Sequence, residues 1–206
     1  MTVLGLTGGS GTGKTTALGV LAERGATVID CDAVYHELVA AGGLMIAELA
    51  HRFPGVVENG RLQRKALGQI VFHDPAALAD LNVITHKYVC QAVDDRLTAL
   101  ALHSPPWRGA PQGWGGSIVA IEAIALIESG LNTRCDLVVG ILAPADERIR
   151  RITAREGIDP AYAQSRIESQ KPDEWFRTHC DHIIENAYPS PAAFAEACRR
   201  LFDRIL

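Results

Sequence analysis

A glycine-rich stretch near the start of the sequence has the residue types and the spacing of a phosphate-binding loop. Residues 8–16 read GGSGTGKTT and match the pattern G-x-x-x-x-G-K-[ST]. Small residues allow backbone N–H groups to turn inward around an anion, because no Cβ blocks the approach of phosphate oxygens. Lys14 is expected to act on the outer phosphates during transfer, and Thr15 to bind Mg²⁺. The predicted nucleotide-binding residues are Gly8, Gly9, Ser10, Gly11, Thr12, Gly13, Lys14, Thr15 and Thr16.

The segments on both sides of this loop have the structures that it requires. Residues 2–6 form a short apolar run typical of a buried strand, and residues 17–24 favour a helix. The N-terminus of that helix adds unpaired backbone amides and the positive end of the helix dipole. The loop is therefore predicted to lie between a strand and a helix, as phosphate binding demands.

A carboxylate and two ring side chains follow the next predicted strand. The strand at residues 26–29 leads to Asp32, and a helix is predicted over residues 33–41. Asp32 fits two roles that one residue can combine, an N-cap of this helix and a base that deprotonates an acceptor hydroxyl. Tyr35 and His36 lie one turn further along, where each can either contact an acceptor or pack on the helix.

A second carboxylate ends a later strand. Residues 117–121 form an apolar run typical of a buried strand, and Glu122 follows it. Parallel strands bind ligands at the edge formed by their carboxyl ends, so Glu122 is expected at that edge. We therefore predict that Glu122 and Thr15 hold the Mg²⁺ ion of a bound nucleotide.

The last third of the sequence contains a cluster of arginines. A strand is predicted at residues 136–142, and Arg148, Arg151 and Arg155 share one face of the helix after it. Arg166 lies on the next predicted helix. Such a stripe is either a solvated surface or a lid whose guanidinium groups neutralise a transferring phosphate.

The middle of the chain has a different pattern. Residues 43–102 show helical periodicity broken by Pro-Gly and Asn-Gly pairs, and Pro75 opens a long last helix. No strand is expected there, and we interpret the stretch as a helical insertion that holds the second substrate. Residues 103–116, rich in proline, glycine and tryptophan, are expected to form an exposed loop. Its tryptophans either pack against the chain or face a ligand or a partner.

The order of these elements predicts the fold class. A fifth strand is expected at residues 182–185 and a closing helix at 192–206. Five strands interleaved with helices favour a single α/β domain of the P-loop NTPase type, with a five-stranded parallel sheet flanked by helices. The expected division of residues 1–206 is a core at 1–42, 117–147 and 180–206, a helical insertion at about 43–102, a loop at 103–116 and an arginine-rich lid at about 148–179.

The composition limits the partners. The 206 residues include 20 Lys and Arg against 24 Asp and Glu, a net charge of −4 that favours neither nucleic acid nor an anionic membrane. The five cysteines form no C-x-x-C pair, and no apolar run reaches the length of about 20 residues that a membrane helix needs. We expect a cytoplasmic protein that is a monomer or a weak homo-oligomer.

Several spacings together resemble one family, the dephospho-CoA kinases, from end to end of the chain. The matching segments are residues 5–16 (GLTGGSGTGKTT), 25–32 (GATVIDCD), 36–39 (HELV), 81–86 (LNVITH), 166–170 (RIESQ) and 180–186 (CDHIIEN). The resemblance implies transfer of the ATP γ-phosphate to the ribose 3′-hydroxyl of dephospho-CoA, the last step of CoA synthesis, with ATP and Mg²⁺.

The resemblance also implies roles for particular residues. Asp32 is then the base, and the lid arginines hold the phosphates, Arg148 and Arg155 in the transition state and Arg151 and Arg166 on the nucleotide. Asn186 is assigned to the adenine pocket. The helical insertion is assigned to dephospho-CoA, with His86 among the residues that contact it.

Three positions depart from the family pattern. The family segment D-x-P-L-L-F-E is here residues 122–128, EAIALIE, so that Glu122 replaces aspartate and the proline is absent. Lys87 stands where the family usually has proline, and Phe176 stands where a basic residue is common.

Two other functions are compatible with the same loop. A phosphate loop fixes the donor but not the acceptor, so another small-molecule or nucleoside kinase is one alternative. A non-catalytic regulator that binds ATP is the other. Asp32 and the arginine-rich lid favour catalysis, because binding alone requires neither.

Overall fold

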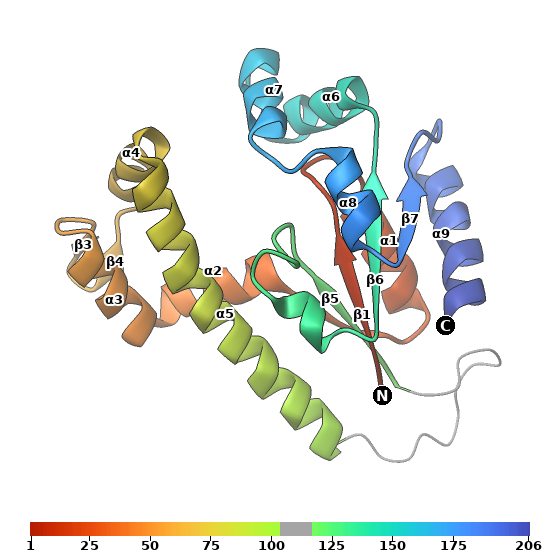
Figure 1. The fold of residues 1–206 in the computed structure, drawn as a ribbon, viewed down its shortest axis with the longest axis horizontal. Coiled ribbons are helices and arrows are strands. Elements are labelled where there is room, and N and C mark those ends of the chain that lie inside the picture. The colour runs from red at the N-terminus through yellow and green to blue at the C-terminus, as the bar shows by residue number, and fades with distance from the viewer. Residues whose placement is uncertain (104–116) are drawn as a thin grey trace. The chain divides into compact units, whose positions relative to one another are not determined.

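The computed structural model describes residues 1–103 and 117–206 of the chain (Figure 1). The loop expected at residues 103–116 lies outside the described residues, apart from His103, which ends a helix. The described chain forms two compact units. The first contains residues 1–29 and 117–206, and the second contains Asp30–His103.

A parallel sheet of five strands organises the first unit. The strands are β1 (Thr2–Thr7), β2 (Thr27–Asp30), β5 (Ile118–Glu122), β6 (Leu137–Leu142) and β7 (His182–Glu185). Their order across the sheet is β2-β5-β1-β6-β7, with β1 paired in parallel to both β5 and β6. The predicted fold class is therefore confirmed.

The position of β1 explains where the phosphate loop lies. β1 is the middle strand, with β5 on one side and β6 on the other, so the chain order reverses direction across the sheet at this point. Such a switch point places the residues after the strand in a crevice at its carboxyl end. β1, β5 and β6 are buried almost throughout, as expected of parallel strands covered on both faces.

Helices cover this sheet on both faces. The helices of this unit are α1 (Lys14–Glu23), α6 (Ala145–Glu156), α7 (Pro160–Glu168), α8 (Asp173–His179) and α9 (Pro191–Ile205), with a 3-10 helix η1 at Leu131–Arg134. α1 and α9 pack on the sheet through a core that includes Leu21, Phe194 and Phe202, while α8 covers the opposite face (Figure 1). α6 and α7 follow the carboxyl end of β6, beside the phosphate loop.

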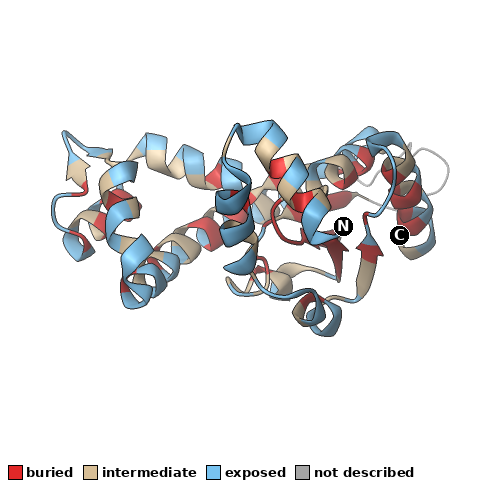
Figure 2. Ribbon diagram, turned by 90° about the horizontal axis from the view of Figure 1, so that it is seen from above, coloured by how far each residue is buried: buried red, intermediate tan, exposed pale blue. Residues whose placement is uncertain are grey.

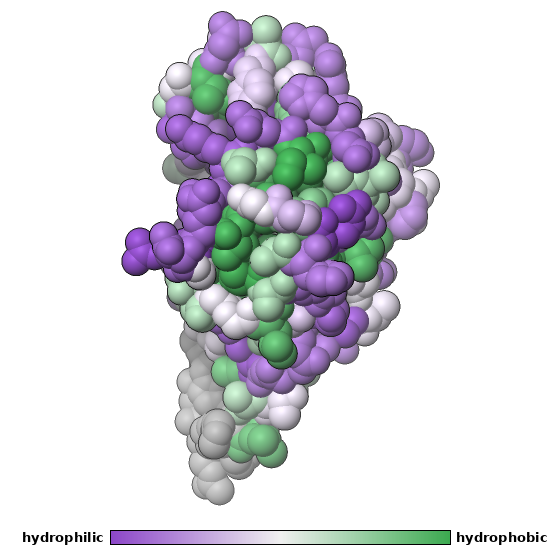
Figure 3. Space-filling view, turned by 90° about the vertical axis from the view of Figure 1, so that its left-hand side faces the viewer, coloured by the Kyte–Doolittle hydropathy of each residue, from purple (hydrophilic) through white to green (hydrophobic). Residues whose placement is uncertain are grey.

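The second unit is built mainly of helices. These are α2 (Cys31–Ala41), α3 (Leu44–Arg52), α4 (Arg64–His73) and α5 (Pro75–His103). They enclose a separate core, whose buried residues include Met45, Leu49 and Phe53 (Figure 2). α2 groups with this unit, so the boundary lies at Asp30, whereas the expected core extended to residue 42. Figure 3 shows the surface coloured by hydropathy, with hydrophobic residues among hydrophilic ones on the face that it draws.

The expectation that residues 43–102 contain no strand is wrong. A small antiparallel hairpin joins β3 (Val57–Glu58) to β4 (Arg61–Leu62). Asn59 and Gly60 have φ values of 51° and 73° at the turn. Positive φ at both central residues is the requirement of a type I′ turn, for which Asn-Gly is the preferred pair.

Membrane-crossing length was tested for the helices in the described ranges. Among residues 1–103 and 117–206, no single helix is both long and apolar enough to cross a bilayer. Only α2 and α3 together meet that test, as a pair bent by 83°.

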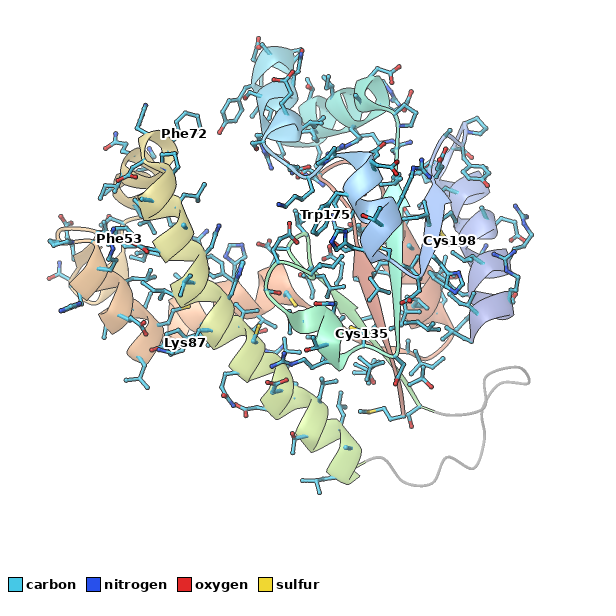
Figure 4. The ribbon with its side chains drawn as sticks, viewed as in Figure 1. Phe53, Phe72, Lys87, Cys135, Trp175 and Cys198 are labelled. Atoms are coloured by element: carbon cyan, nitrogen blue, oxygen red, sulfur yellow. The ribbon has the colours of Figure 1, made fainter. Side chains whose placement is uncertain are left out.

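The cysteines of the first unit are predicted to be unreactive in the native protein. Burial raises the pKa of Cys135 and of Cys198 to about 12 each, and that of Cys180 to about 11 (Figure 4). These thiols therefore stay protonated at pH 8, and only a thiolate attacks iodoacetamide and displaces its iodide. We expect peptide mass mapping to find all three unmodified after treatment at pH 8. The same treatment in denaturant should alkylate them fully, and rapid native labelling of any one would contradict its burial.

Candidate active site

The phosphate loop joins β1 to α1 with a backbone that only glycine adopts readily. Gly8, Gly11 and Gly13 have φ values of 142°, 77° and 106°. Gly13 is the N-cap residue of α1, and Lys14 begins the helix. Within the described part of the chain, the N–H groups of residues 11–15 donate to no protein acceptor. Five consecutive unpaired N–H groups at a helix N-terminus form an anion-binding nest.

A loop that turns its N–H groups inward must satisfy its carbonyl groups on the other side. Here side chains supply most of the donors. Lys14 Nζ donates to Gly8 O at 3.0 Å and to Gly9 O at 3.3 Å, and Thr12 Oγ1 also donates to Gly9 O at 2.9 Å. Gly13 O accepts from the backbone N–H of Thr16 at 3.0 Å.

Arginines of α6 bind the next carbonyls of the loop. Arg148 Nε donates to Ser10 O at 2.9 Å, and Arg151 Nη1 donates to Gly11 O at 3.2 Å. Arg148 is only 5% exposed, and burial lowers its pKa while Asp173 opposes this effect. Arg148 and Arg151, two of the three arginines predicted to share a helix face, therefore bind the loop backbone.

Asn186, just after β7, supplies the last of these donors. Its Nδ2 donates to Thr12 O at 2.8 Å, and its backbone N–H donates to Leu142 O at 2.7 Å. Arg151 Nη2 reaches Asn186 O at 3.5 Å. Asn186 Oδ1 is buried and has no hydrogen-bond partner among residues 1–103 and 117–206. The family resemblance assigned Asn186 to the adenine pocket. In the structure its side-chain amide nitrogen donates to the phosphate loop.

Lys14 lies among several charged side chains. Its Nζ lies 3.5 Å from Glu122 Oε1, and both side chains are mostly buried. Burial lowers the pKa of Lys14, the Glu122 carboxylate opposes this, and Arg148 and Arg155 lower the pKa further by electrostatic repulsion. The structure thus gathers four cations, Lys14, Arg148, Arg151 and Arg155, and one carboxylate around the loop. An incoming phosphate relieves that repulsion, because it favours the charged form of Lys14.

The donor chemistry around the loop fits Mg²⁺. Thr15 is exposed in the first turn of α1, and Glu122 ends β5 beside Lys14. Both present hard oxygen ligands, which Mg²⁺ prefers. Among the described residues, no group of three or more His, Cys, Asp or Glu side chains can hold a metal. An ion bound here would therefore take most of its ligands from water and phosphate, as Mg²⁺ commonly does.

The other two lid arginines pair with one acid at the end of α6. Arg155 Nη2 and Arg166 Nη1 both bond to Glu156, and these bonds lower the pKa of its carboxyl group. Arg155 is more exposed than Arg166, with side-chain exposures of 61% and 35%. Arg155 is therefore a cation near Lys14 that is open to solvent.

One residue of this site received no role from sequence reasoning. Gln170 follows α7, and its Oε1 accepts from Ser10 N at 3.0 Å and from Arg148 Nη2 at 2.5 Å. Its Nε2 donates to Ser10 Oγ at 2.8 Å. The sequence motif RIESQ contained Gln170, but periodicity could not show that it reaches the loop.

In the second unit, two aspartates lie at the start of α2, and Asp30 takes the N-cap role that was expected of Asp32. Asp30 is the N-cap, because its Oδ1 accepts from the N–H groups of Asp32 and Ala33 at 2.9 and 3.1 Å. Asp32 therefore does not cap α2, which was one of its two expected roles. Its side chain is 81% exposed and lies in the first turn of the helix, where a negative charge is favoured.

Asp32, His36 and Arg64 form a chain of two side-chain contacts. His36 Nε2 lies 3.4 Å from Asp32 Oδ2, and His36 Nδ1 lies 2.9 Å from Arg64 Nη2. Arginine can only donate, so Nδ1 of His36 accepts and its proton lies on Nε2, facing Asp32.

Tyr35 packs against the helical core, and burial raises its pKa. His86 lies on α5 and is partly buried.

The chain is similar to known proteins over almost its whole length. A sequence model described as dephospho-CoA kinase matches residues 2–190. The chain belongs to the dephospho-CoA kinase family. It is therefore a kinase of CoA biosynthesis, a phosphotransferase, as the sequence predicted.

The relatives cover nearly the whole chain. A dephospho-CoA kinase of Anaeromyxobacter dehalogenans is 36% identical over 205 residues, covering 98% of this chain and 92% of its own length. That of Leifsonia xyli subsp. xyli is 39% identical over 187 residues, covering 90% and 89%. The solved structure of TT1252 from Thermus thermophilus is 28% identical with a TM-score of 0.76, covering 100% of this chain and 98% of that one.

Two departures from the dephospho-CoA kinase pattern have clear surroundings. Lys87 Nζ, at the position of the usual proline, donates to Glu48 Oε2 at 2.8 Å, and Tyr88 Oη donates to the same oxygen at 2.7 Å (Figure 4). Phe176, at a position often basic, is buried in α8. Both residues thus contribute to packing or pairing where they stand.

The contact between Gly13 and Asn186 generates a prediction. A Cβ at Gly13 overlaps Asn186 Nδ2, and the φ of 106° is strained for any other residue. We expect Gly13→Ala to weaken ATP binding at least tenfold, measured by isothermal titration calorimetry.

Gly19→Ala is the matched control. Gly19 is exposed within α1, and a Cβ at this position would have no neighbouring atom within 4 Å. Alanine should therefore stabilise the fold by about 0.5–1 kcal/mol without changing ATP affinity. Equal ATP affinity in the two variants would contradict the assigned geometry of the loop.

Proposed function

We propose that this chain transfers the γ-phosphate of ATP to the ribose 3′-hydroxyl of dephospho-CoA, giving CoA and ADP. The observation that supports this most is the row of unpaired N–H groups at residues 11–15, which suits the phosphates of a nucleotide. Membership of the dephospho-CoA kinase family supports the acceptor.

In the proposed reaction, the ribose 3′-oxygen forms a bond to the γ-phosphorus. The bond between that phosphorus and the β–γ bridging oxygen breaks, and ADP leaves with its electron pair. The hydroxyl proton passes to the Asp32 carboxylate. Asp32 suits this role because Asp30 caps α2 in its place and because its own side chain is exposed.

Positive charge at the loop opposes the charge of the transferring group. Lys14 is proposed to contact the outer phosphates, and Arg155, exposed and within electrostatic range of Lys14, to approach the transferring phosphate. Arg148 acts from behind the loop, where it holds Ser10 and adds to the positive potential. Arg151, Arg166 and Asn186 are proposed to hold the nucleotide through the loop and the lid.

Mg²⁺ is proposed to be held by Thr15 and Glu122 together with the nucleotide phosphates. When bound, the ion neutralises phosphate charge. The ion pair of Glu122 with Lys14 places this carboxylate at the loop. Glutamate in place of the family's aspartate is compatible with that arrangement.

The second unit is proposed to bind dephospho-CoA. Its α2 and α5 carry the candidate residues Tyr35, His36 and His86. In this proposal residues 43–102 are the acceptor-binding insertion and residues 148–179 the lid of a single enzyme domain. We further propose that the enzyme works in the cytoplasm as a monomer or a weak homo-oligomer.

Acceptor specificity tests the proposed function directly. ADP production with Mg-ATP should be rapid with dephospho-CoA and should stay near background with adenosine, with pantetheine phosphate and without acceptor. The product should be identified as CoA by mass spectrometry. Turnover with another acceptor alone would indicate a different small-molecule kinase, and ATP binding without turnover would indicate a regulator.

A second prediction separates the two aspartates at the start of α2. Asp32→Asn removes the proposed base, so kcat should fall by about a hundredfold or more while ATP binding stays intact. Asp30→Asn is the control, because asparagine also accepts hydrogen bonds as an N-cap and should leave kcat within about twofold. Near-normal turnover of Asp32→Asn would exclude the base role.

A further inference from the structure

Ser10 of the phosphate loop forms hydrogen bonds through its backbone N–H, its hydroxyl and its carbonyl group. Its N–H donates to Gln170 Oε1, its Oγ accepts from Gln170 Nε2, and its carbonyl oxygen accepts from Arg148 Nε, at 3.0, 2.8 and 2.9 Å. Arg148 Nη2 in turn donates to Gln170 Oε1 at 2.5 Å. The three residues form a closed ring of hydrogen bonds through the backbone and side chain of Ser10 and the side chains of Arg148 and Gln170, and Ser10 is 5% exposed.

This ring explains a glycine that backbone strain does not. Gly9 is absent from the positions with positive φ, so its conformation is open to other residues. A Cβ at Gly9, however, overlaps Arg148 Nη2 and Gln170 Oε1. The second glycine of the loop is therefore required by the close approach of these two side chains.

The ring also connects both ends of one segment to the loop. Arg148 lies in the first turns of α6, while Gln170 comes two residues after the end of α7. The backbone N–H of Gln170 donates to Ile167 O at 3.0 Å, which fixes Gln170 to the last turn of α7. The α6–α7 segment is thus attached to Ser10 at its entry and at its exit.

The chemistry of the ring suits an amide at position 170. Both hydrogen-bond partners of the Arg148 guanidinium, Ser10 O and Gln170 Oε1, are neutral. Gln170 Oε1 accepts from Arg148 and from Ser10 N together, so an apolar side chain of the same length leaves two buried donors unpaired. Losing such partners costs far more than the hydrogen bonds contribute on balance.

We propose that Gln170 is a positioning residue for phosphoryl transfer, acting through Arg148 and Ser10. It holds the first half of the loop and the buried guanidinium in place while the N–H groups of residues 11–15 bind the phosphates. Loss of Gln170 therefore impairs transfer more than nucleotide binding. This inference rests on the proposed kinase function.

The test uses Gln170→Met, which keeps the length of the side chain and removes its hydrogen bonds. We expect kcat with dephospho-CoA to fall at least tenfold while the Kd for ADP changes by less than about threefold. Gln164→Met is the matched control, because within the described residues the side chain of Gln164 on α7 bonds only to the exposed Glu168. The control should keep wild-type kcat, and thermal unfolding should confirm that both variants fold.

A double-mutant cycle tests whether Gln170 acts through Arg148. Gln170→Met should lower kcat by less than about threefold further in an Arg148→Met background, because the ring is already broken. Independent effects that multiply would overturn the proposal, as would an unchanged kcat or an equal loss of ADP affinity. If Gln170→Met does not fold, Gln170→Asn, which withdraws the amide by one methylene, is judged by the same criteria. A wild-type protein without kinase activity would instead refute the proposed function.

Discussion

The phosphate site depends on one constraint, that a backbone loop cannot offer its N–H groups to an anion unless its carbonyl groups are satisfied elsewhere. In a helix or a sheet the backbone supplies both partners, but here side chains must do so. They come from α1, from α6 and from the residue after β7, and they reach the loop as Lys14, Arg148, Arg151 and Asn186. Segments more than 130 positions apart in the sequence are thereby needed to shape the loop.

The same constraint places positive charge where the reaction needs it. Three of the side chains that donate to the loop carbonyl groups are cations, namely Arg148 and Arg151 of α6 and Lys14 of the loop. Satisfying the backbone therefore also concentrates positive charge behind the N–H groups that face the anion. Burial lowers the pKa of Lys14 and that of Arg148, which shows that their charges are held at a cost in the free protein. Phosphate groups can compensate for this cost, because they interact favourably with cations that are largely removed from water.

Much of the sheet and the loop could be predicted because each depends on local sequence. Uninterrupted apolar runs identify buried parallel strands, and the spacing from Gly8 to Thr15 identifies the loop. The hairpin at Asn59-Gly60 was missed because two-residue strands are too short to show alternation, although the turn pair itself was visible. The partners of Arg148 and Gln170 could not be predicted, since helical periodicity gives the face of a side chain but not what lies opposite it.

The geometry of Lys14 also limits how the site responds to a nucleotide. An ammonium group has three N–H donors, and in this structure Lys14 directs them toward Gly8 O, Gly9 O and Glu122. Gly9 O keeps Thr12 Oγ1 as a donor if Lys14 turns away, whereas Gly8 O has Lys14 as its side-chain donor. The lysine can therefore release Gly9 and Glu122 and direct two donors to phosphate oxygens while it continues to hold Gly8. The proposed phosphate contact then requires a change in the side-chain torsions of Lys14, and the loop backbone can stay where Arg148, Arg151 and Asn186 hold it.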